Sequence, residues 1–250
     1  MDIIYQLPFP DDVCSKIFFY TCKSPHTGLG INLFKIKSHF RNKRFWNLYS
    51  NIPEMDKDVI NLDEDTFGVN YMNTIPNILL YLNCFYNLTE IWLHNTNVKG
   101  NIEHLKSLRN LTMIGLSGTS VNGDIEHLES LLNLTEINLY NTGVTGNIEH
   151  LKSLHNLTSI NFSNTDVYGD IAHLKSLLNL RNIYLSDTEV NGNIEHLKSL
   201  LNVIKIDLYN TRVNGSIAHM YLLTNLIWID LLETDVTGPP LPVAEETFNT

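Results

Sequence analysis

Apolar and polar residues alternate along this chain in a pattern that returns every 23 residues. The shared unit reads G-x-I-x-H-L-x-x-L-x-N-L-x-x-I-x-L-x-x-T-x-V-x. Its glycine recurs at Gly100, Gly123, Gly146, Gly169, Gly192 and Gly215, with a degenerate earlier copy from Asn77 and a closing glycine at Gly238. A unit this short cannot bury its own apolar face, so seven copies over residues 77–237 predict a stacked solenoid.

Each unit predicts one short strand and one helical turn. In the segment LTMIGLSG, alternation predicts that Ile114 and Leu116 point inward and that Met113 and Gly115 point outward. The segment EHLKSL has leucines three residues apart, which indicates a helical or 3₁₀ turn. Stacking places the strands in a curved parallel sheet on a concave face and the turns on a convex face, which is an α/β solenoid.

Three other positions are nearly constant between units. The glycine predicts a positive φ angle or a close approach between coils. A threonine follows each strand, and its hydroxyl is expected to bond backbone groups in a buried turn; a phosphorylated row is the alternative, which burial disfavours. An asparagine precedes each strand and is interpreted as turn chemistry. The threonines are Thr96, Thr119, Thr142, Thr165, Thr188, Thr211 and Thr234, and the asparagines are Asn87, Asn110, Asn133, Asn156, Asn179, Asn202 and Asn225.

The run V-x-G-x-I, followed by leucines three residues apart, resembles the plant-type leucine-rich repeat. The resemblance covers residues 77–237. The unit departs from the common plant-type repeat in its length by one residue, in threonine where asparagine is usual, and in lacking proline after the isoleucine. The resemblance implies a recognition platform that contacts its partner through outward side chains of the concave sheet, and it leaves the partner unidentified.

The outward strand positions carry many aromatic and acidic side chains. The candidate protein-binding residues are Trp92, His94, Glu136, Tyr140, Tyr184, Asp207, Tyr209, Trp228 and Asp230. Tyrosine and tryptophan are common interface anchors, and the acids of this face outnumber Arg181 and Lys205. These residues predict a non-enzymatic scaffold that binds a protein or peptide, basic or mixed in charge. The alternative is that variable outward positions are only exposed to water.

A histidine occupies the same position in six successive units. The row comprises His104, His127, His150, His173, His196 and His219. A metal ladder or a pH sensor is the functional interpretation, whereas neutral imidazoles that bond to the backbone and to each other are favoured. Neighbouring glutamates such as Glu103 and Glu126 are expected to point away from the row. If the imidazoles are partly buried and neutral, folding should weaken below about pH 6.5.

Residues 1–76 lack the repeat and predict a small, mainly helical N-terminal cap. The segment LPFPDDVCSKIFFYTC is similar to the opening of an F-box, a helical motif that docks on a ubiquitin-ligase adaptor. The similar positions are Leu7, Pro8, Val13, Ile17 and Phe18. This similarity implies the alternative function, an F-box-like substrate receptor of a ubiquitin ligase. Residues 238–250 are expected to form a C-terminal tail.

Charge and motifs narrow the function further. The net charge of −10 disfavours nucleic acid and acidic membranes as partners. The sequence contains no phosphate-binding glycine loop, nucleophile elbow, HExxH or CxxC motif, so we expect no enzymatic activity, no cofactor and no metal. The N-terminus does not resemble a secretory signal, and Cys14, Cys22 and Cys84 lack disulfide-framework spacing, so a cytoplasmic location is expected. The oligomeric state stays open.

Overall fold

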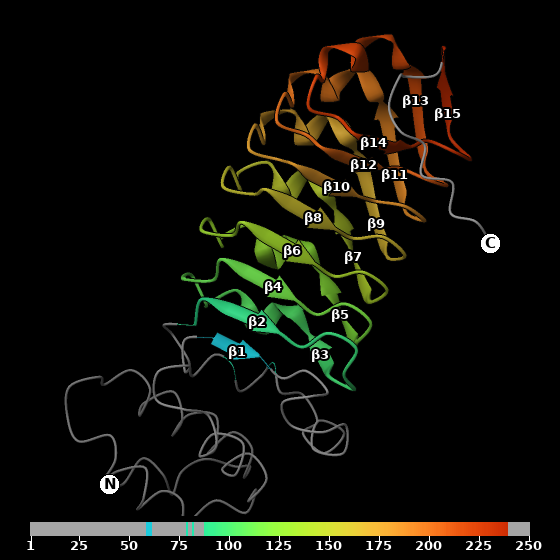
Figure 1. Ribbon diagram of the computed structural model, residues 1–250. Helices are drawn as coiled ribbons and strands as arrows, with labels where there is room; N and C mark the ends of the chain where they lie inside the picture. Colours follow the sequence, from blue (N-terminus) through green and yellow to red (C-terminus); the bar gives the residue numbers. More distant parts are fainter. Residues whose placement is uncertain (1–58, 62–78, 80–81, 83–87, 240–250) are drawn as a thin grey trace, which may run out of the picture.

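The computed structural model describes residues 59–61, 79, 82 and 88–239 of the chain (Figure 1). In this part, coils of 23 residues stack along one axis, and each coil adds a strand to each of two parallel sheets, with a 3₁₀ helix in most coils. The predicted solenoid is therefore confirmed. The F-box-like segment, most of the predicted cap and residues 240–250 lie outside the described residues.

The first sheet has eight strands. They are, in spatial order, β1 (Val59–Asn61), β2 (Glu90–Trp92), β4 (Met113–Gly115), β6 (Glu136–Asn138), β8 (Ser159–Asn161), β10 (Asn182–Tyr184), β12 (Lys205–Asp207) and β14 (Trp228–Asp230). From β2 onward, paired residues are one repeat apart, as Ile137 pairs with Ile160. Strand β1 pairs Ile60 with Ile91 and was not predicted, because 31 residues instead of 23 separate the two isoleucines.

A second sheet of seven parallel strands lies on the other side of the core and was also not predicted. Its strands are β3 (Lys99–Asn101), β5 (Ser120–Asp124), β7 (Gly143–Asn147), β9 (Asp166–Asp170), β11 (Glu189–Asn193), β13 (Arg212–Ser216) and β15 (Asp235–Thr237). Here paired residues are 21 positions apart, so Gly123 lies opposite Val144. The valines of β5 to β13 are buried in the core and give this sheet its inner face; they are Val121, Val144, Val167, Val190 and Val213.

Short 3₁₀ helices follow the strands of the second sheet and confirm the predicted turns. They are η3 (Ile102–Leu105), η4 (Ile125–Leu128), η5 (Ile148–Leu151), η6 (Ile171–Ser176), η7 (Ile194–Ser199) and η8 (Ile217–Leu222). An asparagine, aspartate or serine caps each one; in η5, Glu149 N donates a hydrogen bond of 2.9 Å to Asn147 Oδ1. The capping oxygen of Asn147 lies too close to Gly169 to leave room for a Cβ atom there, and Gly169 has φ +117°. Both expectations for the glycine are thus confirmed.

The inward leucines, isoleucines and valines form one continuous core. Leu111, Leu134 and Leu157, one in each of three successive coils, are all fully buried. Beside them, the Thr165 hydroxyl donates a hydrogen bond of 2.5 Å to Phe162 O, and the same bond recurs in the other coils. Thr165 is 7% exposed, which confirms a structural role for this threonine and disfavours phosphorylation there.

The asparagine row before the strands does more than form turns. Asn156 Nδ2 donates a hydrogen bond of 2.9 Å to Leu132 O, which belongs to the preceding coil. The same bond recurs from Asn133, Asn179, Asn202 and Asn225. The row therefore joins successive coils to each other, whereas the sequence had suggested contacts within one turn.

A second polar row lies just after the strands of the first sheet, in the left-handed backbone conformation. Its members are Asn95, Gly118, Asn141, Asn164, Asp187, Asn210 and Glu233, with φ between +50° and +66°. Some of the side chains bond between coils, as Asn164 Nδ2 donates to Asn141 Oδ1 at 2.8 Å. Asparagine, aspartate and glycine adopt this conformation at low cost, whereas glutamate does not.

We expect Glu233→Asn to raise the free energy of unfolding by about 0.5–1 kcal/mol, because asparagine relieves backbone strain at φ +57°. Urea unfolding followed by circular dichroism measures the change. Glu149→Asn is the matched control, since Glu149 follows a cap and is absent from the positive-φ residues. An equal gain in both variants would contradict the explanation.

Candidate functional site

The outward side chains of the first sheet and of the residues just after its strands form one surface, called the concave face below. All nine candidate residues lie on it. Trp92, Tyr184, Asp207 and Asp230 occupy the central row, Glu136 and Trp228 a row on one side, and His94, Tyr140 and Tyr209 a row on the other. Tyr140 is 46% exposed and Tyr209 38%, and the other seven are partly buried. Their role in binding stays a prediction.

Trp92 and His94 form an apolar cluster at one end of this face, called the aromatic end. Their ring centroids are 5.4 Å apart. Both rings extend over the next strand, because a Cβ atom on Gly115 would lie only 2.7 Å from His94 Cε1 and 3.0 Å from Trp92 Cε3. Trp92 Nε1 donates to Glu90 Oε2 at 2.9 Å, and His94 Nδ1 lies 2.5 Å from Ser117 Oγ. Burial lowers the pKa of His94 from its ordinary value, which favours the neutral ring.

Two aspartates and two tyrosines, Tyr184, Asp207, Tyr209 and Asp230, form the opposite, acidic end. Asp207 Oδ1 accepts a hydrogen bond from Tyr209 N at 3.2 Å, and its Oδ2 accepts one from Ser186 Oγ at 3.0 Å. Burial raises the pKa of Asp207, whereas these two hydrogen bonds lower it. The charges of Asp230 and Asp187 raise it further. Burial also raises the pKa of Tyr184, with an added contribution from Asp207.

The repeat shows that the fold does not require a negative charge at Asp207. The same position is Asn138 in β6 and Asn161 in β8, and each amide Oδ1 accepts a hydrogen bond from the backbone N two residues on, as Asp207 does. Among the described residues, no ion pair joins Asp207 or Asp230 to a lysine or arginine. The acidic end therefore holds carboxylates that asparagine could replace structurally and that no lysine or arginine in the described part of the chain neutralises.

Replacing Asp207 with asparagine should stabilise the protein at pH 7. The folded pKa of Asp207 lies above its ordinary 3.8, so its contribution to stability is present below that pH and is lost as the pH rises through the folded pKa. Urea midpoints of Asp207→Asn and the parent should differ at pH 7 and converge near pH 3.5. Asn161→Asp, which places a charge at the same position two strands away, should show the opposite sign. A difference in urea midpoint that is the same at both pH values would contradict a raised pKa of Asp207 in the folded protein.

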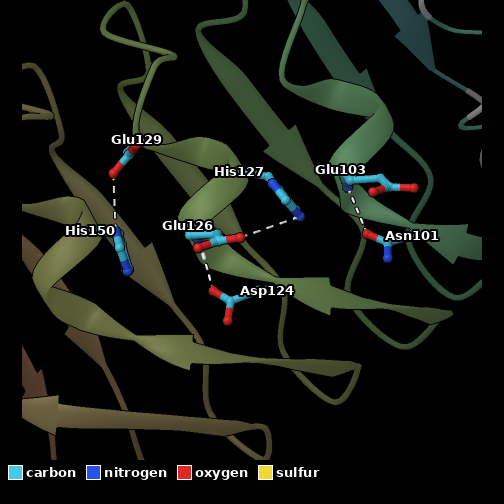
Figure 2. A network of polar contacts seen from close by, with 7 residues as sticks. All are labelled: Asn101, Glu103, Asp124, Glu126, His127, Glu129 and His150. Carbon is cyan, nitrogen blue, oxygen red and sulfur yellow. Dashed lines mark hydrogen bonds and ion pairs between the residues drawn. The ribbon is translucent and has the colours of Figure 1, made fainter.

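The histidine row lies on the 3₁₀ helices, away from the concave face, and it differs from expectation. Figure 2 shows that glutamates lie beside the imidazoles: Glu126 Oε1 is 3.9 Å from His127 Nε2, and Glu129 Oε2 is 3.0 Å from His150 Nδ1. His219 likewise lies 3.5 Å from Glu195. The prediction that the glutamates point away is wrong for Glu126 and Glu195. Five of the six imidazoles are partly buried, as the pH prediction assumed, and His196 is exposed.

No group of three or more histidine, cysteine, aspartate or glutamate side chains in the described part of the chain is arranged to hold a metal ion. Nor does any helix there have the length and apolar character needed to cross a membrane. Sequence reasoning missed three supporting residues of the concave face, namely Gly115, Ser117 and Ser186. Aligning the units by row reveals where they lie, but not which neighbours their side chains meet.

No protein-family model and no curated protein matches this chain. Several solved protein structures do match it. The plant peptide hormone receptor RGFR1, in complex with RGF2, is 26% identical with a TM-score of 0.58, over 62% of this chain and 26% of that one. The Arabidopsis receptor kinase HAESA, solved with the peptide hormone IDA and the co-receptor SERK1, is 25% identical with a TM-score of 0.57, over 62% and 27%. Internalin C2 from Listeria monocytogenes is 20% identical with a TM-score of 0.59, over 75% and 77%.

These similarities establish the fold as a leucine-rich-repeat solenoid. The chain spans about a quarter of the length of the two plant proteins, at 26% and 27%. Leucine-rich-repeat domains typically serve as binding scaffolds without catalytic activity. The comparisons give no support to the F-box-like interpretation of the N-terminal segment.

Proposed function

We propose that this leucine-rich-repeat solenoid is a non-enzymatic scaffold that binds a protein or peptide on its concave face. The observation that carries the proposal is the acidic end, where Asp207 and Asp230 hold charges that the fold does not need, beside two partly exposed tyrosines. RGFR1 and HAESA support it as examples of the same fold in complex with RGF2 and with the peptide hormone IDA.

The proposed partner is basic or mixed in charge. Burial raises the pKa of both Glu136 and Asp207, so each carboxylate is held in the ionised form at a cost that a bound cation would offset. Charge-assisted hydrogen bonds from arginine or lysine to a partly buried carboxylate are stronger than neutral ones. Tyrosine rings supply contact area with little loss of side-chain freedom, which suits anchors of a binding face.

A cytoplasmic location is part of the same proposal, and it rests on the sequence alone. Imaging of the full chain with a small epitope tag, alongside cell fractionation, tests it. Recovery of the tagged chain in the medium or in a membrane fraction would contradict it.

The test of function starts by isolating partners of the full chain by affinity purification and mass spectrometry, and then measures the affinity of a purified partner. Tyr184→Ala combined with Tyr209→Ala should weaken binding by about tenfold or more, because loss of an interface anchor costs more than about 1 kcal/mol. The matched control removes two tyrosines outside the concave face, Tyr168 and Tyr221, each 47% exposed. It should leave the affinity unchanged.

Two outcomes would contradict the proposal. One is a partner that binds the Tyr184 and Tyr209 variant as tightly as the parent. The other is an equal loss in the control variant, which would place the binding surface elsewhere. All four tyrosines are at least partly exposed, so thermal unfolding should change little in either variant and should separate lost binding from lost fold.

A further inference from the structure

We infer that the concave face orients an extended peptide across its strands through two side-chain contacts of different chemistry, whichever way the peptide backbone runs. An apolar or aromatic side chain binds at the aromatic end, and a lysine or arginine binds at the acidic end. This inference rests on the proposed function, because both ends belong to the same face. It adds the order of the two contacts and the distance between them.

The aromatic end suits an apolar side chain. Gly115 has no side chain, so the rings of Trp92 and His94 lean over the backbone of β4, and both side chains stay partly exposed. The indole N–H is already bonded to Glu90, and the imidazole Nδ1 is paired with Ser117 Oγ. With these two atoms paired and His94 Nε2 held over Gly115, what remains for a partner is mainly apolar ring surface, which favours contact with another apolar side chain.

The acidic end suits a cation. Asp207 and Asp230 lie opposite each other on the neighbouring strands β12 and β14, and their backbone hydrogen bonds hold both carboxylates in place. Tyr184 pairs with Asp207 from the other side. A guanidinium or ammonium group placed here meets two carboxylates and an aromatic ring, which is a favourable set of neighbours for a positive charge. Asn138 and Asn161 offer only neutral amides at the same row position.

The sheet order sets the distance between the two ends. Trp92 in β2 and Asp207 in β12 are separated by five strand steps, through β4, β6, β8 and β10. At about 4.8 Å per step the separation is about 24 Å, and an extended peptide covers it with about seven residues. Between the ends, the central row carries Asn138 and Asn161, whose short side chains are bonded back to the backbone and leave room for a peptide.

The experiment selects peptides of about twelve residues, long enough to span both ends, from a random phage-displayed library against the purified full chain. Enriched sequences should combine an apolar or aromatic residue with a lysine or arginine about six to eight positions away, in either chain direction. A synthetic peptide of an enriched sequence then serves as the probe. A version shortened by three residues between these two positions should bind about tenfold more weakly, because it reaches only one end.

Paired substitutions assign each contact. Trp92→Ala should weaken binding of the probe about tenfold. It should have little effect on binding of a probe whose apolar residue is replaced by glycine. Asp207→Asn with Asp230→Asn should weaken the probe about tenfold, yet have little effect on a probe whose lysine or arginine is replaced by glutamine. These aspartate variants keep the backbone hydrogen bonds, as the asparagines at the same position do, so the fold is preserved.

The outcomes separate this inference from the proposed function. The probe could lose affinity for the Tyr184 and Tyr209 alanine variant, while neither Trp92→Ala nor the aspartate variants depend on the matching probe residue. The concave face would then bind peptides without a fixed orientation, and only the inference of two distinct ends would fail. If that alanine variant binds the probe as tightly as the parent, or if no peptide is enriched, both fail.

Discussion

Replacing Phe162 with alanine should lower the free energy of unfolding by about 3–5 kcal/mol. Phe162 is fully buried in the central coils and is the only phenylalanine at a position that is leucine in the adjacent coils, at Leu139 and Leu185. Alanine would leave a cavity between two coils, and the inner faces of both sheets would lose contacts with it. Since each coil is stabilised mainly by its neighbours, damage at the centre affects both halves of the stack.

Phe162→Leu is the matched control. It installs the residue that the adjacent coils already carry, so it should cost only about 1 kcal/mol for the smaller side chain. Urea unfolding monitored by far-ultraviolet circular dichroism gives both values. A loss below about 1 kcal/mol for Phe162→Ala would contradict tight packing of the core at this coil.

Gly169→Ala is the second substitution with a large expected effect, a loss of about 2–4 kcal/mol. Two costs combine. The backbone has φ +117°, which residues with a Cβ atom rarely adopt, and the new methyl group would meet the side chain of Asn147. Moving Asn147 breaks its hydrogen bond to Glu149 N, which caps η5, so the substitution also weakens the preceding coil.

Gly143→Ser tests whether backbone geometry is the cause. Gly143 lies in the same sheet, but its φ angle is not positive and its nearest neighbour, Val121 O, would be 3.3 Å from an added Cβ atom. The adjacent coil has Ser120 at this position. The serine variant should stay within about 0.5 kcal/mol of the parent. Equal losses at the two glycines would show that general crowding, and not the positive φ angle, sets the cost.

The first sheet could be predicted because its signal is both local and repeated. In every unit an isoleucine is flanked by outward residues, and a leucine or phenylalanine follows two positions later, as with Ile183 and Leu185 or Ile160 and Phe162. One unit alone would be ambiguous, but the 23-residue spacing places equivalent residues on adjacent strands. The register of Ile137 on Ile160 follows from that spacing.

The second sheet escaped prediction because its strands offer little local signal. In β9 the single buried valine, Val167, is followed by an exposed tyrosine and a glycine, and glycine is uncommon in strands. Pairing at 21 residues, offset by two from the repeat, also cannot be read from one unit. The contacts of His150 with Glu129 and of Asn156 with Leu132 join different coils, so their geometry depends on how the coils stack.

The candidate site was predictable as a list of residues but not as two distinct ends. The outward positions follow from strand alternation, which placed Trp92, Tyr184 and Asp207 on one face. The lean of Trp92 and His94 over Gly115 depends on side-chain rotamers that alternation does not specify. The repeat alignment places Asp207 and Asn161 at the same position. Only the structure shows that both accept the same backbone hydrogen bond, so that the fold does not need the charge of Asp207.

The contacts between neighbouring central coils use the same parts: one isoleucine pair, one asparagine bond to the coil before, and one glycine beneath a capping side chain. Excising a single 23-residue unit would therefore bring together two surfaces that already fit. Unequal recombination within the gene can lengthen or shorten such a molecule without inventing a new contact. Each such event between β2 and β12 would move Trp92 and Asp207 nearer or farther by one strand spacing, so the size of the preferred ligand would evolve in discrete steps.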